Sequence, residues 1–171
     1  VYNGYSSAYN YSGDGYIQGV EVSLQKDFTF LPAPFDGFGI YANAAFIDSE
    51  VEIDVGDLGD PILRTVPFFN QADEIYNFQL YYERGGLSAR VAWSYQGDST
   101  SSSFSDNPDM DNYRSPRESV DARVSYAFEN GLQLWLTGSN LNDHRALNYR
   151  NGDEFFVSSY EVFGREFRLG I

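Results

Sequence analysis

The sequence predicts an all-β fold, an antiparallel up-and-down meander of about seven strands that forms one arc of a transmembrane β-barrel. Two observations support this prediction. Segments of about ten residues alternate between apolar and polar side chains with a period of two, and a strand of that length can cross a bilayer at a tilt. The connections are by turns very short and roughly twenty residues long, as in a barrel wall with tight turns at one end and loops at the other.

The first two strands are separated by a proline turn. Residues 1–15 are rich in Tyr, Gly and Ser and predict a loop, and the first strand is expected at residues 16–28. Residues 31–37 end it, because their two prolines cannot donate ladder hydrogen bonds. The second strand is expected at residues 38–48, and the acidic, glycine-containing residues 49–72 predict the first long loop.

Five further strands are expected, at residues 73–84, 87–96, 118–128, 132–141 and 161–171. Gly85-Gly86 and residues 129–131 are short reversals of the kind that join antiparallel neighbours. Residues 97–117 and 142–160 are the second and third long loops. The three short turns therefore share one end of the sheet and the three long loops the other.

Composition excludes several classes of protein. A formal net charge of −14 provides no basic stripe for nucleic acid and no polybasic contact with anionic lipid. The absence of cysteine excludes disulfides, thiolate metal sites and a cysteine nucleophile. No apolar run is long enough for a transmembrane helix, and the aromatic content of 18% suits the aromatic girdles of a barrel or a carbohydrate-binding surface. With no signal peptide and no initial Met, the chain is expected to be a piece of a longer protein.

The polar faces favour a barrel wall over a soluble β-sandwich. They contain charges of both signs, which a water-filled lumen permits, and these are expected to form a lumenal charge ladder of Glu21, Arg90, Asp121 and Arg123. Aromatic residues stand near the ends of the apolar faces, as in interfacial girdles, at Phe28, Tyr82, Trp93, Tyr95 and Phe128. A soluble β-sandwich module that binds carbohydrate remains an alternative, because it shows the same alternation. Seven strands cannot close a barrel of this class, so the chain is expected to be part of a larger one.

Short segments along nearly the whole chain resemble one family of outer-membrane proteins. They are residues 19–26, 31–35, 76–83, 87–92, 120–126, 138–143 and 163–170. In this order they resemble the C-terminal barrel of TonB-dependent outer-membrane receptors. The resemblance implies a 22-stranded barrel, with residues 1–171 as its last seven strands, in a bacterial outer membrane.

The resemblance also implies a function and partners. Such receptors import scarce nutrients, most often ferric siderophores and also cobalamin or saccharides, with energy from the TonB complex acting through an N-terminal plug domain. The implied partners are that plug, the TonB complex, a small-molecule nutrient and outer-membrane lipid. The wording around the proline turn looks most like a receptor branch associated with saccharides. The short turns would face the periplasm and the long loops the outside. A passive porin-like channel is the other membrane alternative, and neither is an enzyme.

Aromatic side chains in the expected outer loops are the candidates for ligand contact. Their faces stack on sugar rings or on the catechols of siderophores. They are Phe68, Phe69, Phe104, Tyr113, Tyr149 and Phe155, together with Phe156 and the N-terminal Tyr2, Tyr5, Tyr9 and Tyr11. The alternative is that these rings pack the loops against one another or extend the outer girdle.

Two of the long loops are acidic. Asp54, Asp57 and Asp60 follow Glu50 and Glu52 in the first, and Asp106, Asp109 and Asp111 lie in the second. Carboxylates could bind Ca²⁺, but the spacing matches no defined calcium loop, so solvated acidic loops are favoured and no cofactor is expected. The acidity disfavours capture of an anionic siderophore by the loops alone. His144, the single histidine, lacks metal or triad partners in the sequence and is predicted to be a surface residue.

Overall fold

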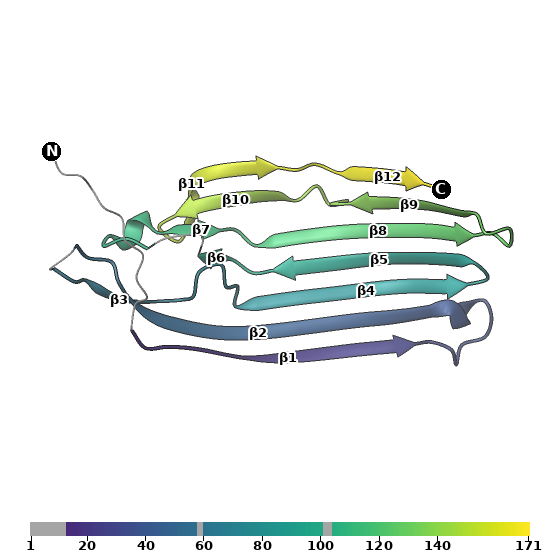
Figure 1. Ribbon diagram of the computed structural model, residues 1–171, viewed down its shortest axis with the longest axis horizontal. Helices are drawn as coiled ribbons and strands as arrows, with labels where there is room; N and C mark the ends of the chain where they lie inside the picture. Colours follow the sequence, from purple (N-terminus) through teal and green to yellow (C-terminus); the bar gives the residue numbers. More distant parts are fainter. Residues whose placement is uncertain (1–12, 58–59, 101–103) are drawn as a thin grey trace.

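The computed structural model describes residues 13–57, 60–100 and 104–171. Its main sheet is an antiparallel meander in which seven strands follow one another in chain order (Figure 1). They are β1 (Gly15–Asp27), β2 (Phe38–Asp54), β4 (Glu74–Arg84), β5 (Leu87–Gln96), β8 (Arg117–Ala127), β9 (Gln133–Ser139) and β12 (Glu166–Gly170). The sheet does not close on itself, since β1 and β12 each pair on one side only within the described residues. The predicted all-β arc is confirmed.

The strand register places the apolar rows of all seven strands on one face. One such row crosses six strands, with each member directly opposite the next in the register. Its members are Ile40, Leu80, Val91, Ala122, Gly138 and Phe167. Side chains alternate between faces along each strand, so the residues between these rows share the other, polar face. A slip of one residue in any strand would exchange its two faces, so the alternation fixes the register.

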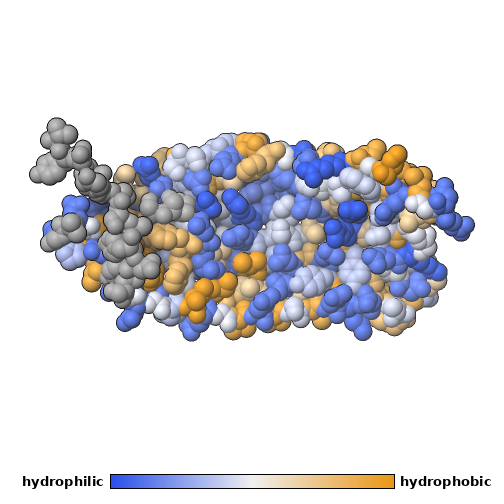
Figure 2. Space-filling model, viewed as in Figure 1, coloured by the Kyte–Doolittle hydropathy of each residue, from blue (hydrophilic) through white to orange (hydrophobic). Residues whose placement is uncertain are grey.

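The wall is a single layer. The apolar face remains exposed, with exposed fractions of 65% at Val20, 39% at Leu80 and 77% at Leu169. A sandwich would bury that face under a second sheet, and the described residues form none that covers it. On the face shown in Figure 2, hydrophilic residues occupy much of the middle and hydrophobic residues gather mainly toward the margins. Polar on one face and apolar on the other, without a core between sheets, is the arrangement of a barrel wall.

Aromatic rings form two belts on the apolar face, as the sequence predicts. Near the short turns, Phe38 packs edge-on against Tyr82 at 4.8 Å between ring centroids. Near the opposite end Tyr76 stacks on Tyr95 at 5.7 Å and contacts Phe46. The predicted girdle residues Phe28, Tyr82 and Phe128 fall in the first belt, and Trp93 and Tyr95 in the second. Such belts mark the two interfaces of a bilayer.

The structure corrects the boundaries of the long loops. β2 extends to Asp54 instead of ending at residue 48, because its last residues keep pairing with β1 and with β3 (Leu63–Val66). Its apolar residues there, Val51 and Ile53, have passed to the opposite face from Phe38–Phe46, so the alternation of the sequence did not reveal the extension. The second loop contains β6 (Ser99–Thr100), a 3₁₀ turn at Pro108–Met110 and β7 (Asn112–Arg114). Another 3₁₀ turn, at Phe35–Gly37, follows the prolines.

The third loop is also largely strand. It contains β10 (Arg145–Arg150) and the first part of β11 (Asp153–Val162). The expected last strand at residues 161–171 is interrupted between β11 and β12, where Gly164 adopts a φ of 71° that ends regular pairing.

These added strands prolong the wall. β11, β10, β7 and β6 form a four-stranded sheet in that order, beyond the ends of β12, β9, β8 and β5 (Figure 1). The short turns and the C-terminus lie at the opposite end. At the β4–β5 turn, Gly85 and Gly86 have φ values of 56° and 83°, as a two-residue hairpin of primed type requires. Within the described residues no helix has the length and apolar character to cross a membrane.

Candidate functional site

The long connections gather into one structured region at the end opposite the short turns. We call this region the loop cluster: β3, β6, β7, β10, β11 and the connections that join them to one another and to the wall strands. It contains the four buried hydrophobic residues of the described chain, namely Val66, Ala72, Ala146 and Tyr149. The Asn70 N–H donates to the Thr100 carbonyl at 2.9 Å, which joins the first long connection to the second. The Ser115 N–H donates to the Leu147 carbonyl at 2.9 Å, which joins the second to the third.

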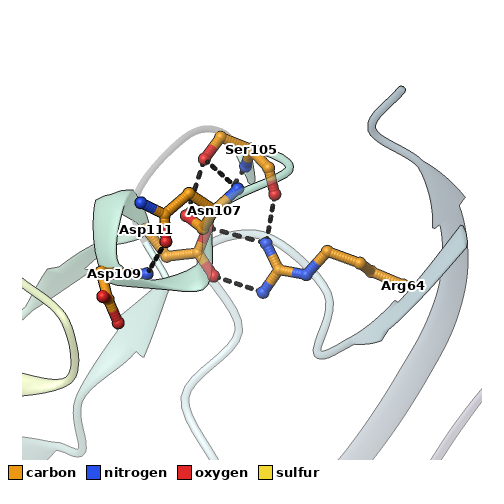
Figure 3. A network of polar contacts seen from close by, with 5 residues as sticks. All are labelled: Arg64, Ser105, Asn107, Asp109 and Asp111. Atoms are coloured by element: carbon orange, nitrogen blue, oxygen red, sulfur yellow. Dashed lines mark hydrogen bonds and ion pairs between the residues drawn. The ribbon is translucent and has the colours of Figure 1, made fainter. Parts of the chain in front are cut away.

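An ion pair links β3 to the connection between β6 and β7 (Figure 3). Arg64 donates from Nη2 to Asp111 Oδ2 at 2.6 Å and from Nη1 to Asp111 Oδ1 at 3.0 Å. Asp111 also accepts from the Ser105 N–H at 3.2 Å, and Arg64 donates to the Ser105 carbonyl. The Asp111 side chain is 2% exposed, and its hydrogen bonds raise the pKa of Arg64. This fork-on-fork pair fixes the two connections relative to each other.

Two of the predicted contact residues pack beside this ion pair. Phe69 stacks on Phe104 with 5.1 Å between ring centroids and 28° between planes. The Arg64 guanidinium lies 5.7 Å from the centre of the Phe104 ring, a cation–π arrangement. Phe69 remains 44% exposed and Phe68 37%. Phe69 and Phe104 are thus held beside the Arg64–Asp111 pair, and Phe69 still reaches the surface.

The predicted contact residues Tyr113 and Tyr149 form a second stack, between β7 and β10. Their ring centroids are 5.6 Å apart and the planes differ by 16°. Tyr149 is 5% exposed and donates from its hydroxyl to Asp98 at 3.4 Å. Its position matches packing of the connections against one another more closely than contact with a ligand.

Phe155, a further predicted contact residue, is exposed to solvent. It stands on β11 at 86% exposure and packs edge-on against Phe156 at 5.6 Å. Such an exposed aromatic pair has the surface to stack on a flat ligand. The other aromatic candidates, Tyr2, Tyr5, Tyr9 and Tyr11, lie outside the described residues.

The Tyr149 hydroxyl is expected to titrate well above the usual pKa of tyrosine. Burial, followed by the nearby charge of Asp98, raises its pKa from 10.0 to about 12. Because the pKa is higher in the folded state, the stabilisation from the neutral ring is complete below pH 10 and lost as pH rises through 10 to about 12. The tyrosinate absorbance that Tyr149→Phe removes should develop near pH 12. Its appearance near pH 10 would contradict this placement.

The four predicted charge-ladder residues share the polar face but do not pair with one another. Glu21 accepts from Asn43 Nδ2 at 2.6 Å, and Asp121 accepts from the Asn140 N–H at 2.9 Å. Arg90 lies directly opposite Arg123, and neither forms a salt bridge with a described residue. Arg123 packs over the Trp135 ring at 5.5 Å. Like charges in direct opposition are unfavourable, so a counter-ion from outside these strands would stabilise the pair.

The acidic residues of the loops have structural partners or stand apart. Asp54 accepts from the N–H groups of Gly56 and Ile62 at 2.9 and 3.0 Å and so closes the β2–β3 turn. Asp111 belongs to the ion pair above. No three acidic or histidine side chains gather into a possible metal site in the part of the chain that the structure describes. That these loops are solvated and hold no calcium stays a prediction.

His144 differs from the predicted surface residue. Its ring is half-buried, and Nε2 is fully buried with no hydrogen-bond partner among the described residues. Asn140, at a φ of 53°, fixes the turn before it by accepting from the His144 N–H at 2.8 Å and donating to the Gly164 carbonyl at 2.9 Å. The ion pair could not be found by local pattern, since Arg64 and Asp111 are 47 residues apart.

A cavity of about 450 Å³ opens where the loop cluster meets the wall. Most of the wall residues that line it belong to the polar face. The lining includes Asn77, Ser94, Gln96, Ser119, His144 and Phe163. Its volume lies in the range of small-molecule sites.

Comparison with known proteins gives one family. The family model described as TonB dependent receptor-like, beta-barrel matches residues 1–141. No curated protein and no solved structure matches the chain. The family consists of outer-membrane transport receptors and not of enzymes. The match covers most of the chain, and the open antiparallel wall agrees with it, so this chain belongs to the TonB-dependent receptor β-barrel family.

Proposed function

We propose that this chain forms part of a receptor that binds a scarce nutrient, a ferric siderophore or a saccharide, at the loop cluster and imports it with TonB-supplied energy. The observation that supports this proposal most strongly is the structure of the loop cluster. A buried ion pair holds together the first two connections, in which Phe68 and Phe69 are exposed, and β11 of the third connection presents Phe155. All three connections lie at the end of the wall away from the short turns. Rigidly supported aromatic surface is suited to capturing flat or ring-shaped ligands.

In this proposal the polar face lines the lumen. The unpaired Arg90 and Arg123 then face the N-terminal plug domain, whose carboxylates would supply the missing counter-ions. The short turns and the C-terminus lie on the periplasmic side. Outer-membrane lipid contacts the opposite, apolar face between the two aromatic belts.

The test uses the full-length receptor in cells with and without a working TonB complex. We expect uptake of a ferric siderophore or an oligosaccharide that requires TonB, and Phe155→Ala should weaken binding by about tenfold if the ring stacks on the ligand. Val157→Ala is the matched control, because Val157 lies on the same strand and is 51% exposed. This variant should bind the ligand normally. Uptake that persists without TonB would instead support the passive-channel alternative. No binding or uptake of either class would overturn the proposal.

A further inference from the structure

A row of uncharged hydrogen-bonding side chains crosses the polar face of five consecutive strands. Each member lies directly opposite the next in the strand register. We call it the neutral row: Ser23, Asn43, Asn77, Ser94 and Ser119. It runs across the wall from strand to strand, because directly paired residues of neighbouring strands lie at the same height.

The neutral row ends in the cavity described above. Asn77, Ser94 and Ser119 line that cavity, with Gln96 beside them and the exposed ring of Phe163 among its walls. The far wall is the turn that Asn140 braces, which is bonded to β8 because Asn142 accepts from the Val120 N–H at 3.1 Å. A cavity between a strand wall and a braced turn keeps its shape when a ligand enters, which lowers the cost of binding.

The hydrogen-bonding groups in this cavity are largely unused by the protein. Within the described residues, the side chains of Asn77, Ser94 and Gln96 make no hydrogen bond, and Ser119 donates to Asp121 while its lone pairs stay free. All four are half-buried. Polar groups in such a position are satisfied by water or by a ligand with matching donors and acceptors.

The side chains around the cavity do not form a built site for an anionic ligand. Arg117 is the single cation among its lining residues, and the Glu118 carboxylate points to the other face, where it accepts from Trp93 Nε1 at 2.7 Å. The binding of carboxylate or phosphate favours clustered arginines, which are absent from this lining. The net charge of −14 adds a further penalty for an anion. Amides and hydroxyls beside an aromatic face are instead suited to a ligand rich in neutral hydroxyl groups.

We propose that this cavity, with the neutral row that leads from it, is a lumenal subsite for a neutral oligosaccharide. This inference rests on the proposed function and names the substrate class among its two alternatives. Phe163 stacks on a sugar ring, while Asn77 and Ser94 exchange hydrogen bonds with ring hydroxyls. The loop cluster above makes the first contact, and the subsite receives the sugar chain on its way into the lumen.

The test measures binding to the purified full-length receptor with malto-, xylo- and chito-oligosaccharides as neutral probes and ferric citrate as the anionic one. Ser94→Ala removes a hydroxyl with little change in volume, and Asn77→Leu replaces the amide by an apolar group of the same branched shape. Each should weaken binding of an oligosaccharide by about tenfold, because a buried hydroxyl of the sugar would lose its partner. Gln133→Leu is the matched control, since it removes an amide from the same face outside this cavity and should leave binding unchanged.

Other outcomes overturn the inference in distinguishable ways. An oligosaccharide that binds equally to wild type and to both variants would remove the subsite and leave the proposed function intact. Binding of ferric citrate alone, with TonB-dependent uptake, would also refute the sugar and retain the receptor. Variants that bind sugar normally but admit a large antibiotic would show that the neutral row holds the plug domain instead. Failure of every probe to bind or enter would defeat the proposed function as well.

Discussion

An arginine in place of Leu80 should prevent most of the full-length receptor from folding in the outer membrane. Leu80 lies on the apolar face between the two aromatic belts, beside Ile40 and Val91. A lipid-facing arginine near the middle of the bilayer costs about 2–4 kcal/mol in barrels of this kind. The measurement is the amount of folded receptor in the outer-membrane fraction, together with urea unfolding in lipid vesicles.

Gln79→Arg is the matched control for this change. Gln79 is the preceding residue of β4 and lies on the polar face, opposite Tyr41 and Ala92. The same arginine there enters a water-filled lumen and should leave folding close to wild type. Equal loss from both substitutions, or greater loss from Gln79→Arg, would show that the faces are assigned the wrong way round.

Removal of the Arg64 side chain is expected to release the first two long connections from each other. Arg64→Ala leaves Asp111 as a charge that is 2% exposed and has lost its ionic partner. Breaking a buried pair in this way costs about 3–5 kcal/mol. Because the stacked Phe69 and Phe104 lie against Arg64, their order should be lost too. Hydrogen exchange in residues 104–114 of the full-length receptor should rise while exchange in the wall stays slow.

The exposed ion pair of Arg84 with Asp36 is the control for this experiment. Its side chains are 41% and 39% exposed at a comparable distance of 2.8 Å. Exposed pairs contribute about 0–1 kcal/mol, so Arg84→Ala should change little. Unchanged exchange in Arg64→Ala would mean that hydrogen bonds such as that from Asn70 to Thr100 hold the connections without the ion pair.

Alternation predicted the wall well because each wall strand contacts two different solvents. Because lipid lies on one side and water on the other, apolar and polar residues alternate along the strand with a period of two. This alternation predicted β5 at its observed bounds, Leu87–Gln96. In the long connections both faces of a strand contact protein or water. The sequences of β10 and β11 therefore do not alternate regularly between apolar and polar residues. In β2, Glu50 and Glu52 made the last residues of the strand resemble a loop. The extent of the loop strands was therefore missed.

The site was only partly predictable for a related reason. Aromatic residues in the loops could be identified from the sequence, but whether a ring is exposed depends on what the fold places over it. Phe155 and Tyr149 were equivalent candidates, yet one is 86% exposed and the other 5%. Asp111 was recognised only as one acid among several, since its partner lies in a different connection. Contact with ligand remains a prediction for every candidate ring.

In the proposed orientation, with the short turns toward the periplasm, the length of β2 determines how far the wall rises above the membrane. Its 17 residues measure about 56 Å at 3.3 Å per residue, or roughly 43 Å of height at a tilt of about 40°. The apolar band of an outer-membrane barrel is about 25 Å tall, and β2 starts at the belt residue Phe38. About 18 Å of strand therefore rises above the hydrocarbon as a stiff collar. In the proposed orientation, solutes would meet the rim of this collar before they reach the lipid.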